Sequence, residues 1–195
     1  MIICGIDEAG RGPLAGPVVV AAVIMNKHCI IPGIKDSKKL TQAKRSKLFD
    51  DIINQSDFHR IEIIDSNIID EINILKSVML GIEKCIVDLD KEGTELLIDG
   101  NYFKLPNNAQ SNFNFQTIVK GDSKIYEISC ASILAKVARD RIMAEYDNIY
   151  PVYNFKSNKG YGTQMHIKSL LKYGPCEIHR KTFIKKILGQ GRLFK

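Results

Sequence analysis

The sequence predicts an α/β fold in which helices pack on one β-sheet and a small helical extension follows at the C-terminus. Three observations support this. Short β-branched, apolar runs recur between longer segments whose apolar residues have helical spacing. The length of 195 residues suits one domain with a sizeable core. After Tyr150 and Pro151 the chain becomes rich in Gly and Lys. We therefore predict a single domain, 1–195, with the helical extension at about 150–195.

The first half of the chain supplies the first three predicted strands. Residues 1–6 form a short apolar run typical of a buried strand, and residues 18–24 are β-branched and apolar. The Gly- and Pro-rich segment 9–17 separates these two strands, which we expect to pair. A helix is predicted at 41–54 because its first residue is a threonine suited to an N-cap, and 58–64 alternates as a strand.

The second half alternates helices and strands. Seven apolar residues at helical spacing predict one long amphipathic helix over 67–89. The apolar face of a second long helix predicts it to run from Ile125 to about Tyr146. The remaining predicted elements are, in order, strands at 94–98 and 115–119, a Gly- and Lys-rich loop at 156–162, a helix at 163–173, and a basic helical segment after Gly174 and Pro175.

The composition indicates which class of partner the protein binds and in which cellular compartment it works. The net charge of +6 and the pI near 9.0 favour a polyanionic partner such as nucleic acid. The five cysteines are odd in number and lack Cys-x-x-Cys spacing, which is typical of free thiols in a reducing compartment. The apolar run Val18–Met25 is too short to span a membrane, and acids appear too early for a signal peptide. We expect a cytoplasmic protein, and nothing in the sequence calls for more than a monomer.

Acidic residues follow three of the predicted strands: Asp7 and Glu8, then Asp99, then Asp122. Ligand sites form where the ends of neighbouring strands converge, and four carboxylates there would suit two Mg²⁺ ions for phosphodiester chemistry. An acid after a strand also commonly caps a turn, so a structural role stays open for each. Adjacent strand residues point to opposite faces. We therefore expect Asp7 to end the strand, with Glu8 sharing its site only through a local twist.

Segments along nearly the whole chain resemble, in order, the motifs of ribonuclease HII, the prokaryotic type 2 ribonuclease H. The matching segments are 5–18, 36–40, 99–101, 120–122, 131–141, 159–163, 174–175 and 179–180. The resemblance implies a ribonuclease H-like mixed sheet flanked by helices, with a helical C-terminal extension. It also implies that Asp7, Glu8, Asp99 and Asp122 are catalytic ligands of a divalent metal, Mg²⁺ or Mn²⁺.

The resemblance further implies the substrate and its contacts. Members of the family hydrolyse the RNA strand of RNA–DNA hybrids. They also incise 5′ to single ribonucleotides in duplex DNA, leaving 3′-OH and 5′-phosphate ends. The substrate-binding residues it implies are Gly10, Arg11 and Gly12, beside the ribose 2′-OH, and Tyr161, at the RNA–DNA junction. Glycine permits close backbone approach, and the 2′-OH distinguishes RNA from DNA. Independently of the resemblance, phosphate contacts suit Ser37, Lys38 and Lys39.

Three other interpretations compete with this one. A non-catalytic, basic nucleic-acid-binding module is disfavoured because carboxylates repel phosphate unless metals intervene. A nucleotide-phosphate loop at 10–16 fits neither the P-loop spacing nor the Gly-x-Gly-x-x-Gly spacing. A specificity that needs a run of ribonucleotides stays open. Roles also stay open for five further residues, in site support, helix ion pairs or structural hydrogen bonds: Lys136, Arg139, Asp140, His166 and His179.

Overall fold

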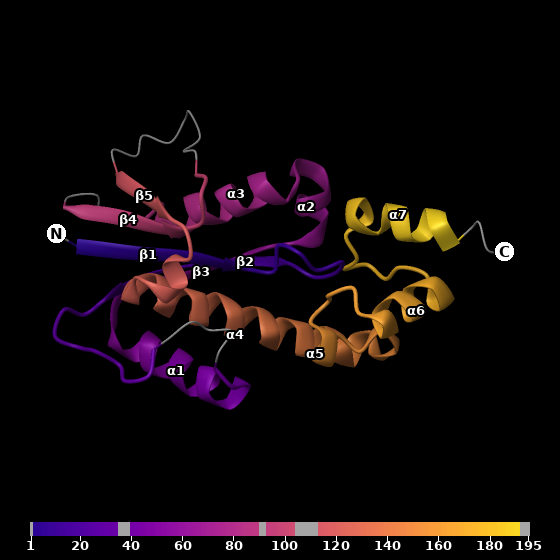
Figure 1. Cartoon of the computed structure of the whole chain (residues 1–195), viewed down its shortest axis with the longest axis horizontal. Coiled ribbons are helices and arrows are strands. Elements are labelled where there is room, and N and C mark those ends of the chain that lie inside the picture. Colours follow the sequence, from indigo (N-terminus) through magenta and orange to yellow (C-terminus); the bar gives the residue numbers. More distant parts are fainter. Residues whose placement is uncertain (1, 35–39, 90–92, 104–112, 192–195) are drawn as a thin grey trace.

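A computed structural model describes residues 2–34, 40–89, 93–103 and 113–191 and contains one five-stranded mixed sheet. The strand order is β3-β2-β1-β4-β5 (Figure 1). β2 pairs antiparallel with β1 and β3, whereas β4 lies parallel to β1 and β5 parallel to β4. The bounds are Ile2–Ala9, Val18–Met25, Ser56–Ile64, Thr94–Asp99 and Asn114–Ile118 for β1 to β5. The predicted α/β class and all five strands are confirmed.

Helices cover both faces of the sheet (Figure 1). α2 (Ser66–Ile72) and α3 (Ile74–Ile86) lie on one side, and α1 (Gln42–Gln55) and α4 (Tyr126–Ile149) on the other. In β2, Val18, Val20 and Ala22 belong to the core under α3, whereas Val19, Ala21 and Val23 belong to the core under α4. Burial on both faces explains why β2 is apolar throughout instead of alternating.

The prediction of one long helix over 67–89 is wrong, because α2 and α3 are separate. Asn73 lies between them with a φ of 69°. Its side-chain oxygen accepts hydrogen bonds from the backbone N–H of Leu75 and of Lys76, at 3.0 and 3.1 Å, and caps α3. An Asn side chain that caps the next helix competes with continuation of the preceding one. The apolar spacing continues across the break because Ile69 of α2 and Val78 of α3 enter the same core.

The extension at the C-terminal end begins with a 3-10 turn, Pro151–Tyr153, and contains α5 (Phe155–Asn158), α6 (Gln164–Tyr173) and α7 (Lys181–Gly191) (Figure 1). The segment predicted as a loop at 156–162 therefore starts within a short helix. The backbone N–H of Gly16 donates to the carbonyl of Ile178 at 2.9 Å. This hydrogen bond fastens the extension to the segment that follows β1. Among the helices that the structure describes, none has the length and apolar character needed to cross a membrane.

Candidate active site

β1 places two acids side by side without ending at either of them. The strand continues to Ala9, with Asp7 opposite Ala21 and Glu8 opposite Val20. The expectation that Asp7 ends the strand is therefore wrong. The side chains leave opposite faces: Asp7 hydrogen-bonds Ser132 of α4, whereas Glu8 follows the α3-side residue Ile6 at strand spacing. Both still line one cavity because they lie at the carboxyl end of β1.

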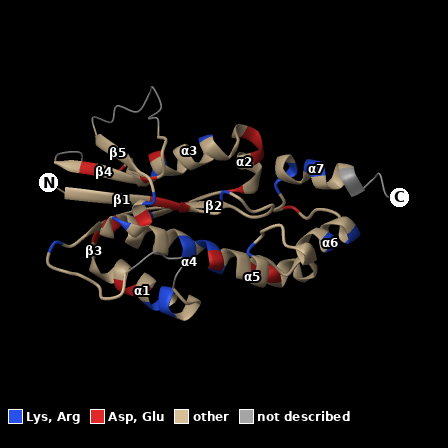
Figure 2. Ribbon diagram, in the orientation of Figure 1, with Lys and Arg blue, Asp and Glu red and all other residues tan. Residues whose placement is uncertain are grey.

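This cavity has a volume of about 280 Å³ and gathers most of the predicted site. Its lining comes from the end of β1, the loop after it, β4, α4 and the extension. The residues that line it are Asp7, Glu8, Ala9, Gly10, Arg11, Gly12, Asp99, Ser132, Lys136, Arg139 and Tyr161. Three of the four predicted acids therefore share one cavity with Tyr161 and with the start of the loop between β1 and β2, residues 10–17, which we call the glycine-rich loop. Figure 2 shows acidic residues at this end of β1 and basic residues on α4, α6 and α7.

Asp99 and Asp122 come from neighbouring chain segments. Asp99 ends β4, the parallel neighbour of β1. Its Oδ1 accepts a hydrogen bond of 2.6 Å from the backbone N–H of Gly121. Asp122 follows Gly121 in a 3-10 turn, Gly121–Ser123, and is 5% exposed. Asp122 does not line the cavity, but its turn is fastened directly to the carboxylate of Asp99.

Burial and repulsion between like charges make the acidic pair costly. Desolvation and the nearby carboxylate of Glu8 raise the pKa of Asp7 well above its ordinary value, while a hydrogen bond from Ser132 lowers it. Desolvation also raises the pKa of Glu8, and Arg11 opposes this. The guanidinium of Arg11 lies 3.1 Å from Oε1 of Glu8. Asp99 adds repulsion to both acids. A cation would relieve this repulsion, so the oxygen donors fit a divalent metal.

Within the described ranges, no three carboxylate, imidazole or thiol groups already stand together at metal-ligating spacing. Carboxylates without a cation repel one another, and Mg²⁺ typically uses one or two of them together with water and substrate phosphate.

Gly10 and Gly12, in the loop after β1, both line the cavity but lie in different environments. Gly10 is buried with a φ of 101°. Gly12 is exposed, and a Cβ built there would lie 3.7 Å from Cε1 of Tyr161. The ring of Tyr161, which is 46% exposed, therefore stands next to Gly12.

Two buried arginines hold this loop in place. Arg139 of α4 donates to the carbonyls of Ala15, Pro17 and Lys159 at 3.2, 2.9 and 2.9 Å. Burial lowers its pKa to about 10, so the guanidinium stays charged at pH 7. Arg139, Ser132 and Lys136 share one helical face, which is the sequence signal that marks these residues as site-facing. Of the roles left open for Lys136 and Asp140, the structure shows the helix ion pair, with 2.7 Å between Nζ and Oδ1.

Arg180 holds the same loop from the extension. Its guanidinium donates to the carbonyls of Gly10 and Arg11 at 2.6 and 2.9 Å, and to those of Gly16 and Pro17 at 2.9 and 3.1 Å. Burial lowers the pKa of Arg180 to about 9. Sequence reasoning noted Arg180 only as part of a motif and missed this role, which depends on contacts between residues far apart in the chain.

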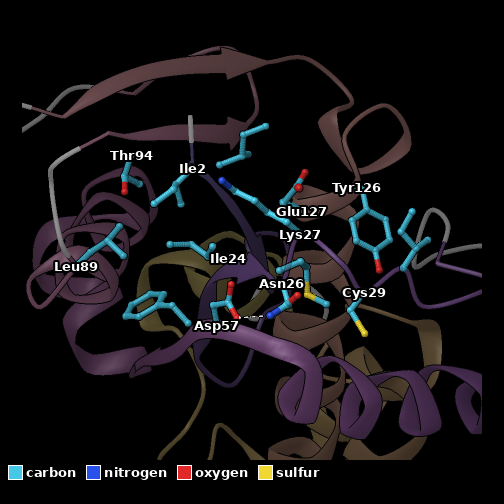
Figure 3. A pocket seen from close by; sticks show the side chains of 14 residues that line it. Ile2, Ile24, Asn26, Lys27, Cys29, Asp57, Leu89, Thr94, Tyr126 and Glu127 are labelled. Carbon is cyan, nitrogen blue, oxygen red and sulfur yellow. Dashed lines mark hydrogen bonds between the residues drawn. The ribbon is translucent and has the colours of Figure 1, made fainter.

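Not every predicted contact falls in the described structure. Ser37, Lys38 and Lys39 lie outside the described residues. A larger cavity of about 770 Å³ lies at the other end of β1, beside Ile2 (Figure 3). Its lining is mainly apolar, with Tyr126 and Glu127 on one side and an Asn26–Asp57 hydrogen bond of 2.9 Å on another. Three of the four acids that the sequence predicts for the site line the smaller cavity, and none of the four lines the larger one.

Comparison with known proteins agrees with the site geometry. The profile of the family described as Ribonuclease HII matches residues 4–186. The chain belongs to the ribonuclease HII family. A ribonuclease HII of Caldicellulosiruptor bescii is 54% identical over 186 residues, which cover 95% of this chain and 88% of the relative. One of Francisella tularensis subsp. holarctica is 50% identical over 183 residues, covering 94% and 95%.

Solved structures show the same fold. Ribonuclease H2 from Pyrococcus horikoshii has a TM-score of 0.76 at 28% identity, covering 98% of this chain and 99% of that one. Ribonuclease HII from Archaeoglobus fulgidus, solved in complex with PCNA, has a TM-score of 0.77 at 24% identity, covering 97% and 96%. The ribonuclease HII family consists of metal-dependent endoribonucleases, and the chain is an endonuclease of RNA–DNA hybrids.

Proposed function

We propose that the enzyme cuts on the 5′ side of a ribonucleotide, including a single one within duplex DNA, and leaves 3′-OH and 5′-phosphate ends. Asp7, Glu8, Asp99 and Asp122 hold the divalent metal, Mg²⁺ or Mn²⁺. One observation carries the proposal: three of these acids line the same cavity as the glycine-rich loop and Tyr161. Cleavage and recognition of the ribose therefore occur at one place.

The residues around the acids orient their carboxylates and offset part of their charge. Bound divalent cations supply activation of the attacking water and stabilisation of the leaving 3′ oxygen. Ser132 and the backbone N–H of Glu8, the latter at 2.7 Å, orient the carboxylate of Asp7. Arg11 pairs with Glu8 and compensates part of its charge before substrate arrives. The N–H of Gly121 fixes the carboxylate of Asp99 and links it to the turn that carries Asp122.

Recognition of the ribose rests on the loop next to the acids. Gly12 is exposed and has no side chain, so a sugar can approach its backbone closely. The ring of Tyr161 stands beside it and offers an apolar face to the sugar or base at the junction. A site whose polar groups pair with a hydroxyl rejects analogues that lack the hydroxyl. Deoxyribose lacks the 2′-OH, so such a site selects a ribonucleotide over a deoxyribonucleotide.

The rest of the surface supports binding of a duplex. Exposed lysines lie on α6 and α7, and Figure 2 shows them in blue on both helices. Lysines of this kind contact phosphates and release counterions. We assign phosphate contacts also to Ser37, Lys38 and Lys39. We further propose that the enzyme acts as a monomer in the cytoplasm, and its five free cysteines support a reducing compartment.

The test compares Tyr161→Ala with Tyr161→Phe on two substrates, a duplex with one ribonucleotide and a long RNA–DNA hybrid. Tyr161→Ala is expected to lose more cleavage at the single ribonucleotide, by about tenfold or more. A long hybrid offers many equivalent cleavage positions, whereas a single ribonucleotide offers one. Tyr161→Phe keeps the ring and should retain most of the selectivity. Tyr173→Ala, which removes a tyrosine 53% exposed on α6, is the matched control. Equal losses on both substrates with Tyr161→Ala would remove Tyr161 from the junction.

A further inference from the structure

Two histidines of the extension are buried against each other. His166 of α6 is 0% exposed and His179 is 2% exposed. Their Nε2 atoms are 3.0 Å apart. The rings of Tyr153 and Phe155 pack around both imidazoles, with ring centroids 4.9 to 6.2 Å away. Nothing in the cleavage chemistry described above uses this pair.

The partners of the pair define the position of each proton. The backbone N–H of Cys176 donates to Nδ1 of His179 at 3.0 Å, so this nitrogen is an acceptor. The proton of His179 must then be on Nε2, from which it is donated to Nε2 of His166. The proton of His166 is left on Nδ1, which donates to the backbone carbonyl of Tyr161 at 2.9 Å. Burial lowers the pKa of both imidazoles, that of His179 to about 4, so both are neutral at pH 7.

The dipeptide His179-Arg180 connects this chain of hydrogen bonds to the arginine that holds the glycine-rich loop. His179 is followed directly by Arg180, whose guanidinium reaches the carbonyls of Gly10 and Arg11. The backbone N–H of Arg180 also donates to the carbonyl of Leu14 at 2.8 Å. Arg180 thus contacts the loop beside the acids, and His179 connects through His166 to the backbone carbonyl of Tyr161.

We propose that His166 and His179 form a directional hydrogen-bond relay that, together with Arg180, sets the distance between the glycine-rich loop and Tyr161. The two histidines are positioning residues, since they act through the backbone carbonyl of Tyr161. The proposal rests on the proposed role of Tyr161 at the junction. Without the relay, the carbonyl of Tyr161 keeps only the 2.8 Å hydrogen bond from Thr163 N–H. Leu14 N–H still donates to the carbonyl of Gly160 at 2.8 Å, so the segment stays attached to the loop, but the carbonyl of Tyr161 loses the hydrogen bond that fixes its orientation, and with it the ring beside Gly12.

The first experiment reads the relay without any activity. Long-range ¹H–¹⁵N spectra of the imidazoles at pH 7 distinguish the two neutral tautomers and the charged form. The proposal requires His179 with its proton on Nε2 and His166 with its proton on Nδ1, and a scalar coupling across the N–H···N bond between them. His28, which is exposed, supplies the reference signal. The opposite tautomers, or charged imidazoles at pH 7, would overturn the relay.

The second experiment asks whether the relay acts through Tyr161. His166→Phe keeps an aromatic ring but removes both hydrogen bonds, and it should shift the ratio of single-ribonucleotide to hybrid cleavage in the direction that Tyr161→Ala does, by about tenfold. The double variant should shift the ratio no further than Tyr161→Ala alone, because both changes remove one arrangement. His166→Gln offers a donor and an acceptor and should restore the ratio. His28→Phe is the control and should leave the ratio unchanged.

The outcomes separate the two proposals. If Tyr161→Ala shifts the ratio and a folded His166→Phe variant does not, the relay is refuted and the junction role stands. A further shift in the double variant would also refute action through Tyr161. If Tyr161→Ala leaves the ratio unchanged, the junction role fails, and the proposal that the relay sets substrate selectivity fails with it. The imidazole spectra would then still show whether the hydrogen-bond chain itself exists.

Discussion

Gly10 and Gly12, in the loop after β1, are expected to respond very differently to substitution by alanine. At Gly10, where φ is 101°, an added Cβ would lie 2.1 Å from Nε of Arg139 and 2.8 Å from the carbonyl oxygen of Pro17. Both distances are shorter than any real Cβ contact, and Arg139 is 1% exposed and cannot move into solvent freely. Gly12 meets only the ring of Tyr161, at the ordinary contact distance of 3.7 Å.

The free energy of unfolding should therefore separate the two variants. A non-glycine residue in such a backbone conformation costs about 1–3 kcal/mol. Displacing Arg139 from one of its carbonyl partners costs a further ~1.5–3 kcal/mol, because the donor is charged. Gly10→Ala is thus expected to destabilise the protein by about 2.5–6 kcal/mol. Gly12→Ala should stay within about 0.5 kcal/mol of the unaltered protein.

Thermal melting in chelator, followed by circular dichroism, measures this difference. Each kcal/mol corresponds to roughly 2–4 °C at this chain length, so the melting temperature of Gly10→Ala should fall by about 5 °C or more. Gly12→Ala should melt normally yet cut a single-ribonucleotide duplex poorly, because its methyl group lies where the sugar approaches. A normally melting Gly10→Ala, or an equally unstable pair of variants, would refute the account of how Arg139 holds the loop.

Three further predictions address charge. Asp99→Asn should reduce cleavage by more than about 100-fold while duplex binding survives, because an amide still accepts from Gly121 N–H but ligates a metal poorly; full activity would contradict the ligand assignment. Asp7→Asn should raise the melting temperature in chelator. Burial and repulsion raise the pKa of Asp7, so its ionised form destabilises the fold as the pH rises, and an uncharged amide removes this cost. An unchanged melting temperature would contradict this account of Asp7. The pKa of His179 is lowered to about 4, so the unfolded chain binds the proton first as the pH falls, and the free energy of unfolding should drop by about 1–2 kcal/mol between pH 7 and pH 5. The melting temperature of His179→Phe should therefore depend less on pH than that of the unaltered protein. An equal dependence on pH would disprove the assignment.

The fold was predictable wherever one residue pattern has one structural meaning. The apolar run of β2 reflects burial on both faces, and Thr41 caps α1 by accepting from Lys44 N–H at 3.3 Å, as its position predicts. The break at Asn73 was not predictable from spacing, because α2 and α3 bury residues in the same core. The decisive hydrogen bonds are those of an Asn side chain, a residue that also occurs within ordinary loops.

The candidate site was predictable in its residues but not in how they are held. Asp7, Glu8 and Asp99 follow short apolar runs in the sequence, and parallel pairing of β1 with β4 brings Asp99 beside the other two acids. The clamps formed by Arg139 and Arg180 join residues up to 170 positions apart in the chain. No local pattern marks a buried arginine whose partners are backbone carbonyls, so this part of the site required the three-dimensional structure.

The most direct test of the central claim is incision of an end-labelled DNA duplex that contains one ribonucleotide. The purified enzyme is assayed with Mg²⁺, with Mn²⁺ and with chelator, beside an all-DNA duplex of the same sequence. The account predicts a single cut on the 5′ side of the ribonucleotide with metal only, leaving 3′-OH and 5′-phosphate ends, and no cut in the all-DNA duplex. No incision with either metal, or equal cutting in chelator, would contradict it.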